Sequence, residues 1–195
     1  MSAVQRFFHN LTAMPILLLL TTCGLTSKDG WKAAVEVQTA QLGYRNWIVI
    51  AEASFPAHSR PGTRQVNTYE PIPVVLDEVL RTLERTEHVR PRIFIPREMR
   101  AVENDFAPGI DGYREVLDEA LHGHEFTELD QDSLMTLVQD AQKSFDVLVL
   151  RTTTALPYTS IFLELQPGYW DGESEERLRT EMKRRRMEKL ASPAP

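Results

Sequence analysis

The sequence is poor in the residues that build disulfides and metal centres. Cys23 is the single cysteine among 195 residues, so the chain has neither an internal disulfide nor a zinc site made of cysteines. His122 and His124 lie two residues apart and flank Gly123, where a helix is expected to end. A histidine there interacts favourably with the helix dipole, which explains the pair without a metal. We therefore expect no metal ion.

A glycine-rich loop and an excess of positive charge are missing as well. Pro61-Gly62 predicts a turn and lacks the glycine spacing of a phosphate-binding loop, so no nucleotide cofactor is expected. The net charge of −6 argues against nucleic-acid binding, because attraction to phosphates dominates that binding. The basic run from Lys183 to Arg186 is flanked by glutamates and indicates a solvated helix face.

Acidic side chains are also absent from residues 1–28. An apolar run over residues 15–20 precedes Cys23 and is too short to span a bilayer. This layout resembles a bacterial lipoprotein signal, in which a cysteine after a short apolar segment carries the lipid. We expect residues 1–22 to be a signal segment and Cys23 to anchor an exported protein to a membrane, in the periplasm or at the cell surface. The alternative is an N-terminal extension of a cytoplasmic protein.

The rest of the chain alternates between helix-like and strand-like patterns of apolar residues. The residues between 71 and 85 carry the clearest helical stripe, and residues 147–150 form a continuous apolar run typical of a buried strand. No second domain or repeat is evident, so one domain is expected over residues 24–167, followed by a polar, helical tail over 168–195. The predicted helices are 32–42, 71–85, 111–121 and 133–145, the predicted strands are 47–53, 92–95, 124–129, 147–150 and 159–165, and a loop is predicted over 54–70.

Strands separated by helices predict an α/β fold, here a single three-layer α/β domain with a largely parallel central sheet. In such sheets ligands bind at the carboxyl ends of the strands. Two loops have that position: residues 52–59, which follow the first strand, and residues 151–160. Glu52 and Arg151 begin these loops, and Arg151 either pairs with Glu52 or extends into solvent.

The residues of both loops resemble one known family. The segment 43–59, with "IVIAEASFPAHS", resembles the first motif of the ribose pyranase and fucose mutarotase (RbsD/FucU) family, a Gly-His-x-Asp turn followed by a strand and a Phe-Pro-Ala-His-Ser loop. Downstream, "RTTTALPYTSIFLEL" resembles the closing motif of that family. The resemblance covers residues 24–167 and implies an RbsD-like fold, no cofactor, a homo-oligomer and a monosaccharide as the bound partner.

The family interconverts sugar anomers and ring forms, and the resemblance implies a role for each matching position. The family's proton-donating histidine corresponds to Tyr44, and the aspartate of the same turn corresponds to Asn46. His58 is retained, and we take Tyr44 and His58 as the candidate catalytic residues. The candidate substrate-binding residues are Glu52, Arg151, Tyr158 and Ser160.

The two replacements in the first motif weaken the expectation of catalysis. A phenol loses its proton near pH 10, whereas an imidazole does so near pH 6.5, so Tyr44 is a poor proton shuttle at neutral pH. Three interpretations follow: a monosaccharide mutarotase or pyranase-like isomerase with a divergent site, a non-catalytic monosaccharide-binding protein, or an oligomeric assembly protein on the same fold.

Overall fold

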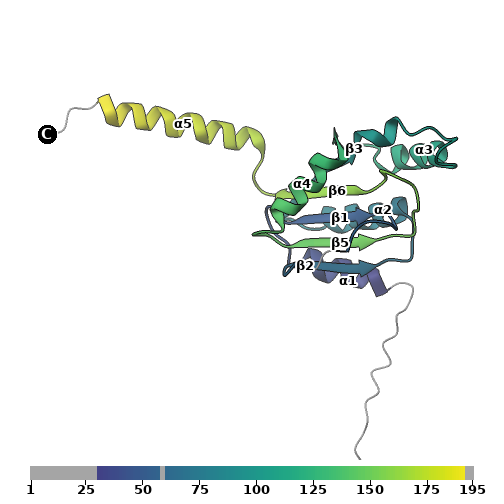
Figure 1. Cartoon of the computed structure of the whole chain (residues 1–195). Helices are drawn as coiled ribbons and strands as arrows, with labels where there is room; N and C mark the ends of the chain where they lie inside the picture. The colour runs from purple at the N-terminus through teal and green to yellow at the C-terminus, as the bar shows by residue number, and fades with distance from the viewer. Residues whose placement is uncertain (1–29, 58–59, 192–195) are drawn as a thin grey trace, which may run out of the picture.

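A six-stranded sheet forms the centre of the protein. The computed structural model describes residues 30–57 and 60–191, and the strands lie in the order β2-β5-β1-β6-β3-β4 (Figure 1). The elements are α1 (Gly30–Thr39), β1 (Trp47–Ala51), β2 (Thr63–Asn67), α2 (Ile72–Glu84), β3 (Val89–Pro96), a 3-10 turn η1 (Arg97–Arg100), α3 (Ile110–Ala120), β4 (Phe126–Leu129), α4 (Gln131–Ala141), β5 (Val147–Arg151), β6 (Ile161–Pro167) and α5 (Gly172–Ala191).

The sheet is mostly parallel, as the sequence predicts. β5 pairs in parallel with β1 and β2, and β3 pairs in parallel with β4. β6 is the exception, because it runs antiparallel to both of its neighbours, β1 and β3. Its antiparallel direction brings the amino end of β6 to the same edge of the sheet as the carboxyl ends of β1 and β5.

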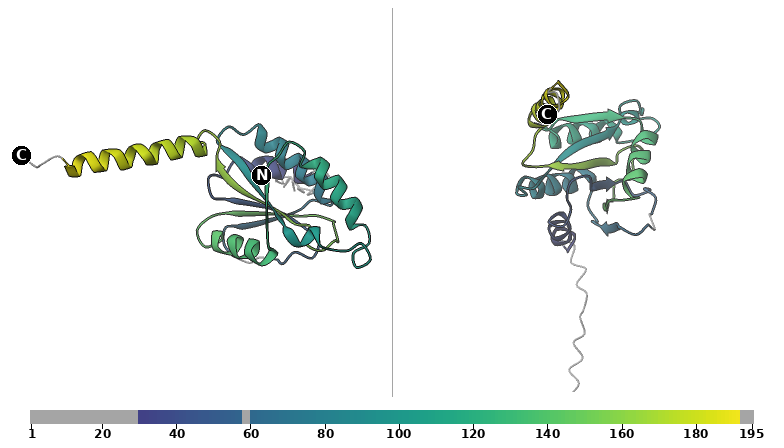
Figure 2. Two further views of the ribbon diagram at one scale, coloured as in Figure 1. Left: turned by 90° about the horizontal axis from the view of Figure 1, so that it is seen from above. Right: turned by 90° about the vertical axis from the view of Figure 1, so that its left-hand side faces the viewer.

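Helices cover the two faces of the sheet unequally, which gives the expected three layers. Ile48 and Ile50 of β1 face a large core shared with α1, α2 and α3. Trp47 and Val49 point to the opposite face and pack with residues of α4. Of the helices in the described part of the chain, α4 alone lies on that face (Figures 1 and 2). The alternation along β1 follows from the strand geometry, in which successive side chains point to opposite faces.

The loop predicted over residues 54–70 is wrong in part, because it contains β2. β2 forms an edge of the sheet and pairs with β5, with Thr63 opposite Val147 and Asn67 opposite Arg151. None of its five residues is buried. A strand held by backbone hydrogen bonds at an edge needs no apolar alternation, so its sequence carries no recognisable pattern.

The C-terminal helix α5 stands apart from the rest of the fold. It projects from the body in Figure 1 and in the left view of Figure 2, and none of its 20 residues is buried. Within residues 30–57 and 60–191, no helix combines the length and the apolar character needed to cross a membrane.

Candidate functional site

The carboxyl end of β1 meets the amino end of β6 at a cluster of polar groups. Glu52 follows the last residue of β1, and its backbone N–H donates a hydrogen bond to Ser160 Oγ at 3.1 Å. Ser160 directly precedes β6 and is fully buried. We call Glu52, Arg151, Tyr158, Thr159 and Ser160 the carboxyl-end site.

The carboxylate of Glu52 is half-buried and held from two sides. Its Oε2 accepts a hydrogen bond from the backbone N–H of Thr159 at 3.2 Å, and its Oε1 accepts one from Ser54 Oγ at 2.8 Å. A carboxylate offers about four acceptor positions, so these two bonds fix its orientation and leave capacity for the hydroxyl groups of a ligand.

Tyr113 of α3 supports the loop that holds Glu52. Its side chain is buried, and its hydroxyl donates a hydrogen bond to the carbonyl oxygen of Thr159 at 3.0 Å. Burial, assisted by the negative charge of Glu52, raises the pKa of Tyr113 well above the ordinary 10.0. Tyr113 therefore stays protonated and remains a hydrogen-bond donor at neutral pH.

Tyr158 has an unusual backbone conformation beside this cluster. Its φ of 60° lies in the left-handed region, which costs a residue with a Cβ roughly 1–2 kcal/mol. Its side chain is 40% exposed, so a tyrosine ring at the site is accessible to solvent. Non-glycine residues with such φ values often occur at functional sites.

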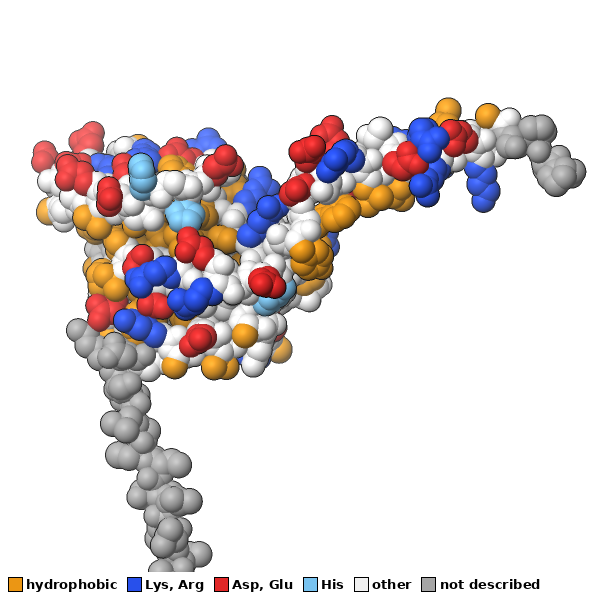
Figure 3. All heavy atoms as spheres, turned by 180° about the vertical axis from the view of Figure 1, so that it is seen from behind, with side chains coloured by type: hydrophobic (Ala, Val, Ile, Leu, Met, Phe, Trp, Pro, Cys, Tyr) orange, Lys and Arg blue, Asp and Glu red, His pale blue; other side chains and the backbone are white. Residues whose placement is uncertain are grey.

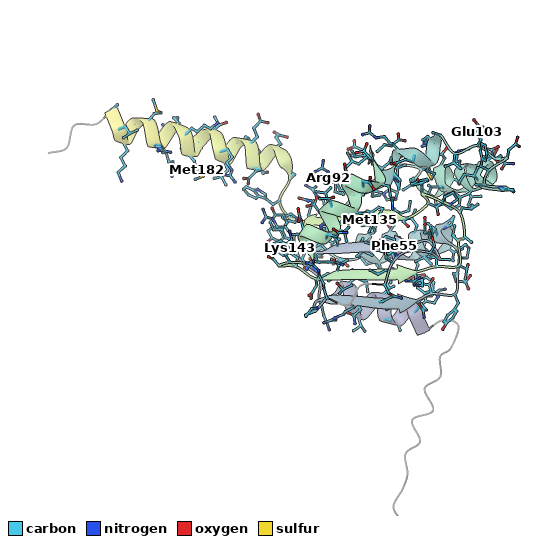
Figure 4. All side chains as sticks on the ribbon, in the orientation of Figure 1. Phe55, Arg92, Glu103, Met135, Lys143 and Met182 are labelled. Carbon is cyan, nitrogen blue, oxygen red and sulfur yellow. The ribbon has the colours of Figure 1, made fainter. Side chains whose placement is uncertain are left out.

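Arg151 has a different environment from either of the two expected from the sequence. Its guanidinium donates hydrogen bonds to the carbonyl oxygens of Ala53 at 2.8 Å and Phe55 at 2.6 Å. It therefore ties the loop after β1 to the end of β5. Phe55, which is labelled in Figure 4, anchors the same loop. Its ring is buried beside Phe162, with 6.3 Å between the ring centroids.

Thr154 links this edge of the sheet to α2. Its Oγ1 accepts a hydrogen bond at 2.9 Å from the backbone N–H of Ile72, the first residue of α2, and its carbonyl oxygen accepts one from Ala53 at 2.8 Å. Pro71 precedes α2 and provides no side-chain cap. The hydroxyl of Thr154 takes that role.

Tyr44 does not join these residues within one chain. It precedes β1, whereas Glu52 follows β1, and five strand residues of about 3.3 Å each separate the two ends by roughly 16 Å. Tyr44 lines a surface depression with Trp170 and Arg179, where α5 leaves the body. The guanidinium of Arg45 stacks on the Tyr44 ring, 5.2 Å from its centroid.

Asn46 has a clear structural role in the turn before β1. Its Oδ1 accepts a hydrogen bond from the N–H of Gly43 at 2.7 Å, and its Nδ2 donates one to the carbonyl oxygen of Asp146 at 3.2 Å. The second bond needs the amide, because an ionised aspartate has no donor.

Two of the candidate residues, Cys23 and His58, lie outside the described residues. Within the described part, no three His, Cys, Asp or Glu side chains are grouped so that they could hold a metal ion. The sequence alone does not identify Thr159 and Tyr113 as parts of the site. A residue pattern does not indicate which backbone N–H groups will contact a side chain, as that of Thr159 does. In the sequence, Tyr113 cannot be distinguished from other aromatic residues on the apolar face of a helix.

The fold of this chain is similar to several solved structures. No family model matches the sequence, and no curated protein matches it significantly. RbsD from Bacillus subtilis, solved with D-ribose, is 19% identical over 69% of this chain and 92% of its own, with a TM-score of 0.47. The fucose mutarotase from Streptococcus pneumoniae, solved with L-fucose, is 22% identical over 66% of this chain and 88% of its own, with a TM-score of 0.42. FucU from Bifidobacterium longum is 14% identical over 66% of this chain and 90% of its own, with a TM-score of 0.43.

Proposed function

We propose that the carboxyl-end site binds a monosaccharide. The observation that carries the proposal is the half-buried carboxylate of Glu52, fixed by Thr159 at the end of a central strand and still able to accept hydrogen bonds. Carboxylates that retain acceptor capacity suit sugar hydroxyls, and the exposed ring of Tyr158 offers an apolar face for the C–H side of a pyranose. The resemblance of both motifs to the RbsD/FucU family supports the same class of ligand.

Interconversion of anomers or ring forms is the second candidate function. That reaction needs a group that removes a proton from the anomeric hydroxyl and another that delivers a proton to the ring oxygen. The specific observation in favour is the position of Glu52, whose carboxylate could accept the first proton. Tyr44 lies at the opposite end of β1, so a catalytic role for it requires a site shared between copies.

One NMR experiment separates binding from catalysis. Saturation-transfer measurements on ribose and fucose report binding, and exchange spectroscopy on the same samples reports the rate of anomer exchange. We expect saturation transfer with wild-type protein and its loss in Glu52→Gln, which keeps the shape of the side chain and removes the charge. Accelerated exchange would identify an isomerase. Absence of both signals with these and related monosaccharides would contradict the proposed ligand class.

Ser54→Ala is the matched control. It removes one bond to Glu52 at an exposed position and keeps the charge, so we expect saturation transfer to persist. If Ser54→Ala abolished binding as completely as Glu52→Gln, the charge of Glu52 would not be the deciding feature.

We also propose that the mature protein is a lipoprotein anchored through Cys23. The acid-free N-terminal segment and the apolar run before Cys23 support this proposal. Mass spectrometry of the protein purified from its native host should find a chain that begins at Cys23 and carries acyl groups. A native chain that begins at Met1 would contradict it.

A further inference from the structure

An apolar groove with acidic margins lies between α2 and α3. Pro73 and Val74 of α2 line it on one side, and Val116 and Ala120 of α3 line it on the other. Val74 is 45% exposed and Val116 is 54% exposed, so these apolar side chains are not covered by the rest of the chain. The groove is therefore a surface that binding could bury.

The margins of this groove carry negative charge. Asp77, Glu115 and Glu119 line it, and all three are exposed. Asp77 is paired with Arg81 on the same helix. Glu115 and Glu119 make no ion pair with any other residue that the structure describes. Figure 3 shows acidic side chains gathered over α3, with apolar side chains directly below them.

α5 carries the complementary chemistry on one of its sides. Met182, Arg186 and Leu190 follow one another at intervals of four residues, so they form one row along the helix, and Lys183 and Met187 form the adjoining row. The three apolar side chains are 55%, 67% and 73% exposed for Met182, Met187 and Leu190. Lys183 and Arg186 have no ion-pair partner among residues 30–57 and 60–191.

The other side of α5 is saturated by its own ion pairs. Glu181 pairs with Arg184 and Arg185, and Arg184 also pairs with Glu188. These contacts stabilise the helix in water by a few tenths of a kcal/mol each, as pairs three or four residues apart generally do. Lys183, Arg186 and most of the exposed apolar side chains of α5 thus lie on one side, and Leu178 and Lys189 flank it.

We propose that α5 of one copy of this chain docks into the α2–α3 groove of a second copy. The apolar side chains of these two rows would cover Val74 and Val116. The two cations of the rows, Lys183 and Arg186, would pair with Glu115 and Glu119. The groove cannot be that of the same chain, because α5 projects from the end of the body opposite to α3 (Figures 1 and 2), and the second copy supplies a groove of matching charge. Met182 lies on this projecting helix, clear of the body (Figure 4). The proposal does not depend on the proposed sugar site.

Sedimentation velocity of the full chain, from micromolar to hundreds of micromolar concentrations, tests the contact. We expect concentration-dependent self-association that weakens as salt is raised. Lys183→Gln with Arg186→Gln should raise the dissociation constant by roughly tenfold, and Glu115→Gln with Glu119→Gln should do the same from the groove side. A wild-type protein that remains a monomer over this range would overturn the proposal.

Arg184→Gln with Arg185→Gln is the matched control for α5. It also removes two positive charges, but from the opposite side of the helix. We expect it to change the dissociation constant by less than about threefold. Far-UV circular dichroism verifies that each variant retains its helices. Equal weakening by both α5 variants would indicate a general charge effect and would overturn the proposed face.

Charge reversal supplies an independent test. Lys183→Glu with Arg186→Glu, and Glu115→Lys with Glu119→Lys, should each self-associate poorly, whereas an equimolar mixture of the two should associate again. Failure of the mixture would contradict the pairing of these surfaces. A lipid surface is the competing partner, and co-sedimentation with phosphatidylglycerol vesicles tests it. The proposal would be overturned if the chain stayed monomeric and bound these vesicles through Lys183 and Arg186.

Discussion

The carboxylate of Glu52 accepts a hydrogen bond from the backbone N–H of Thr159 at 3.2 Å, which joins the end of β1 to the loop that enters β6. The same loop is also held by α3, because the hydroxyl of Tyr113 donates a hydrogen bond to the carbonyl oxygen of Thr159. Thr159 therefore connects a charged side chain at the surface with a buried phenol in the core.

Ser160→Ala should destabilise the fold. Ser160 Oγ is buried and accepts the hydrogen bond of the Glu52 N–H, and alanine would leave that donor without its partner. Loss of a partner for a buried polar group costs about 1–3 kcal/mol. Urea denaturation measures the change in the free energy of unfolding, and an unchanged midpoint would show that water replaces the serine.

Tyr113→Phe should change how stability depends on pH. Because the folded protein raises the pKa of Tyr113 above its ordinary 10.0, the folded state retains this proton when the unfolded state has lost it. The stability from this group is therefore complete below about pH 10 and declines as the pH rises further. The range from about pH 8 to about pH 11 brackets the ordinary tyrosine pKa of about 10. Over this range, the urea midpoint should fall more steeply for wild type than for Tyr113→Phe. Parallel decline in both proteins would contradict this prediction.

Asn46→Asp should destabilise the protein, even though it makes the turn more similar to the family motif. The aspartate keeps an acceptor for Gly43 but loses the donor to Asp146, and it places a negative charge next to that carbonyl oxygen. We expect a loss of about 1–3 kcal/mol near neutral pH, measured by thermal or urea denaturation. A more stable variant would show that the amide of Asn46 has no structural role.

Tyr158→Gly should separate stability from binding. Glycine adopts a positive φ without steric cost, and this relief should offset much of the lost packing of the half-exposed ring, so we expect stability within about 1 kcal/mol of wild type. Monosaccharide affinity should fall by roughly tenfold, because an aromatic face in contact with a ligand contributes on the order of 1 kcal/mol or more. Unchanged affinity, measured by NMR titration, would remove Tyr158 from the site.

The sequence predicts the architecture better than the details of the site. The buried strands β1 and β5 and the apolar stripe of α2 are decided by side-chain periodicity, so they follow from the residues. β2 does not, because an exposed edge strand depends on its backbone pairing with β5. The site is predictable to a similar extent. The positions of Glu52 and Ser160 at neighbouring strand ends follow from the order of the elements. The contact between Glu52 and the backbone of Thr159 does not, because it depends on a loop conformation.

Arg151 and Asn46 illustrate a second limit. A charged side chain near Glu52 suggests an ion pair, yet Arg151 binds two backbone carbonyl oxygens instead. Asn46 suggests a lost catalytic partner, yet its amide closes a turn. In both cases a buried or partly buried backbone group needs a hydrogen-bond partner, and this need is not visible in the residue types.

A monosaccharide titration followed by amide chemical shifts is the decisive test of sugar binding at the carboxyl-end site. With isotope-labelled protein and ribose or fucose, we expect the amides of Glu52, Thr159 and Ser160 to shift together with one dissociation constant. The amide of Tyr44 should be unaffected within a single chain, and Glu52→Gln should abolish the shifts. Saturable shifts confined to residues far from these three amides, or no shift with any monosaccharide tested, would contradict it.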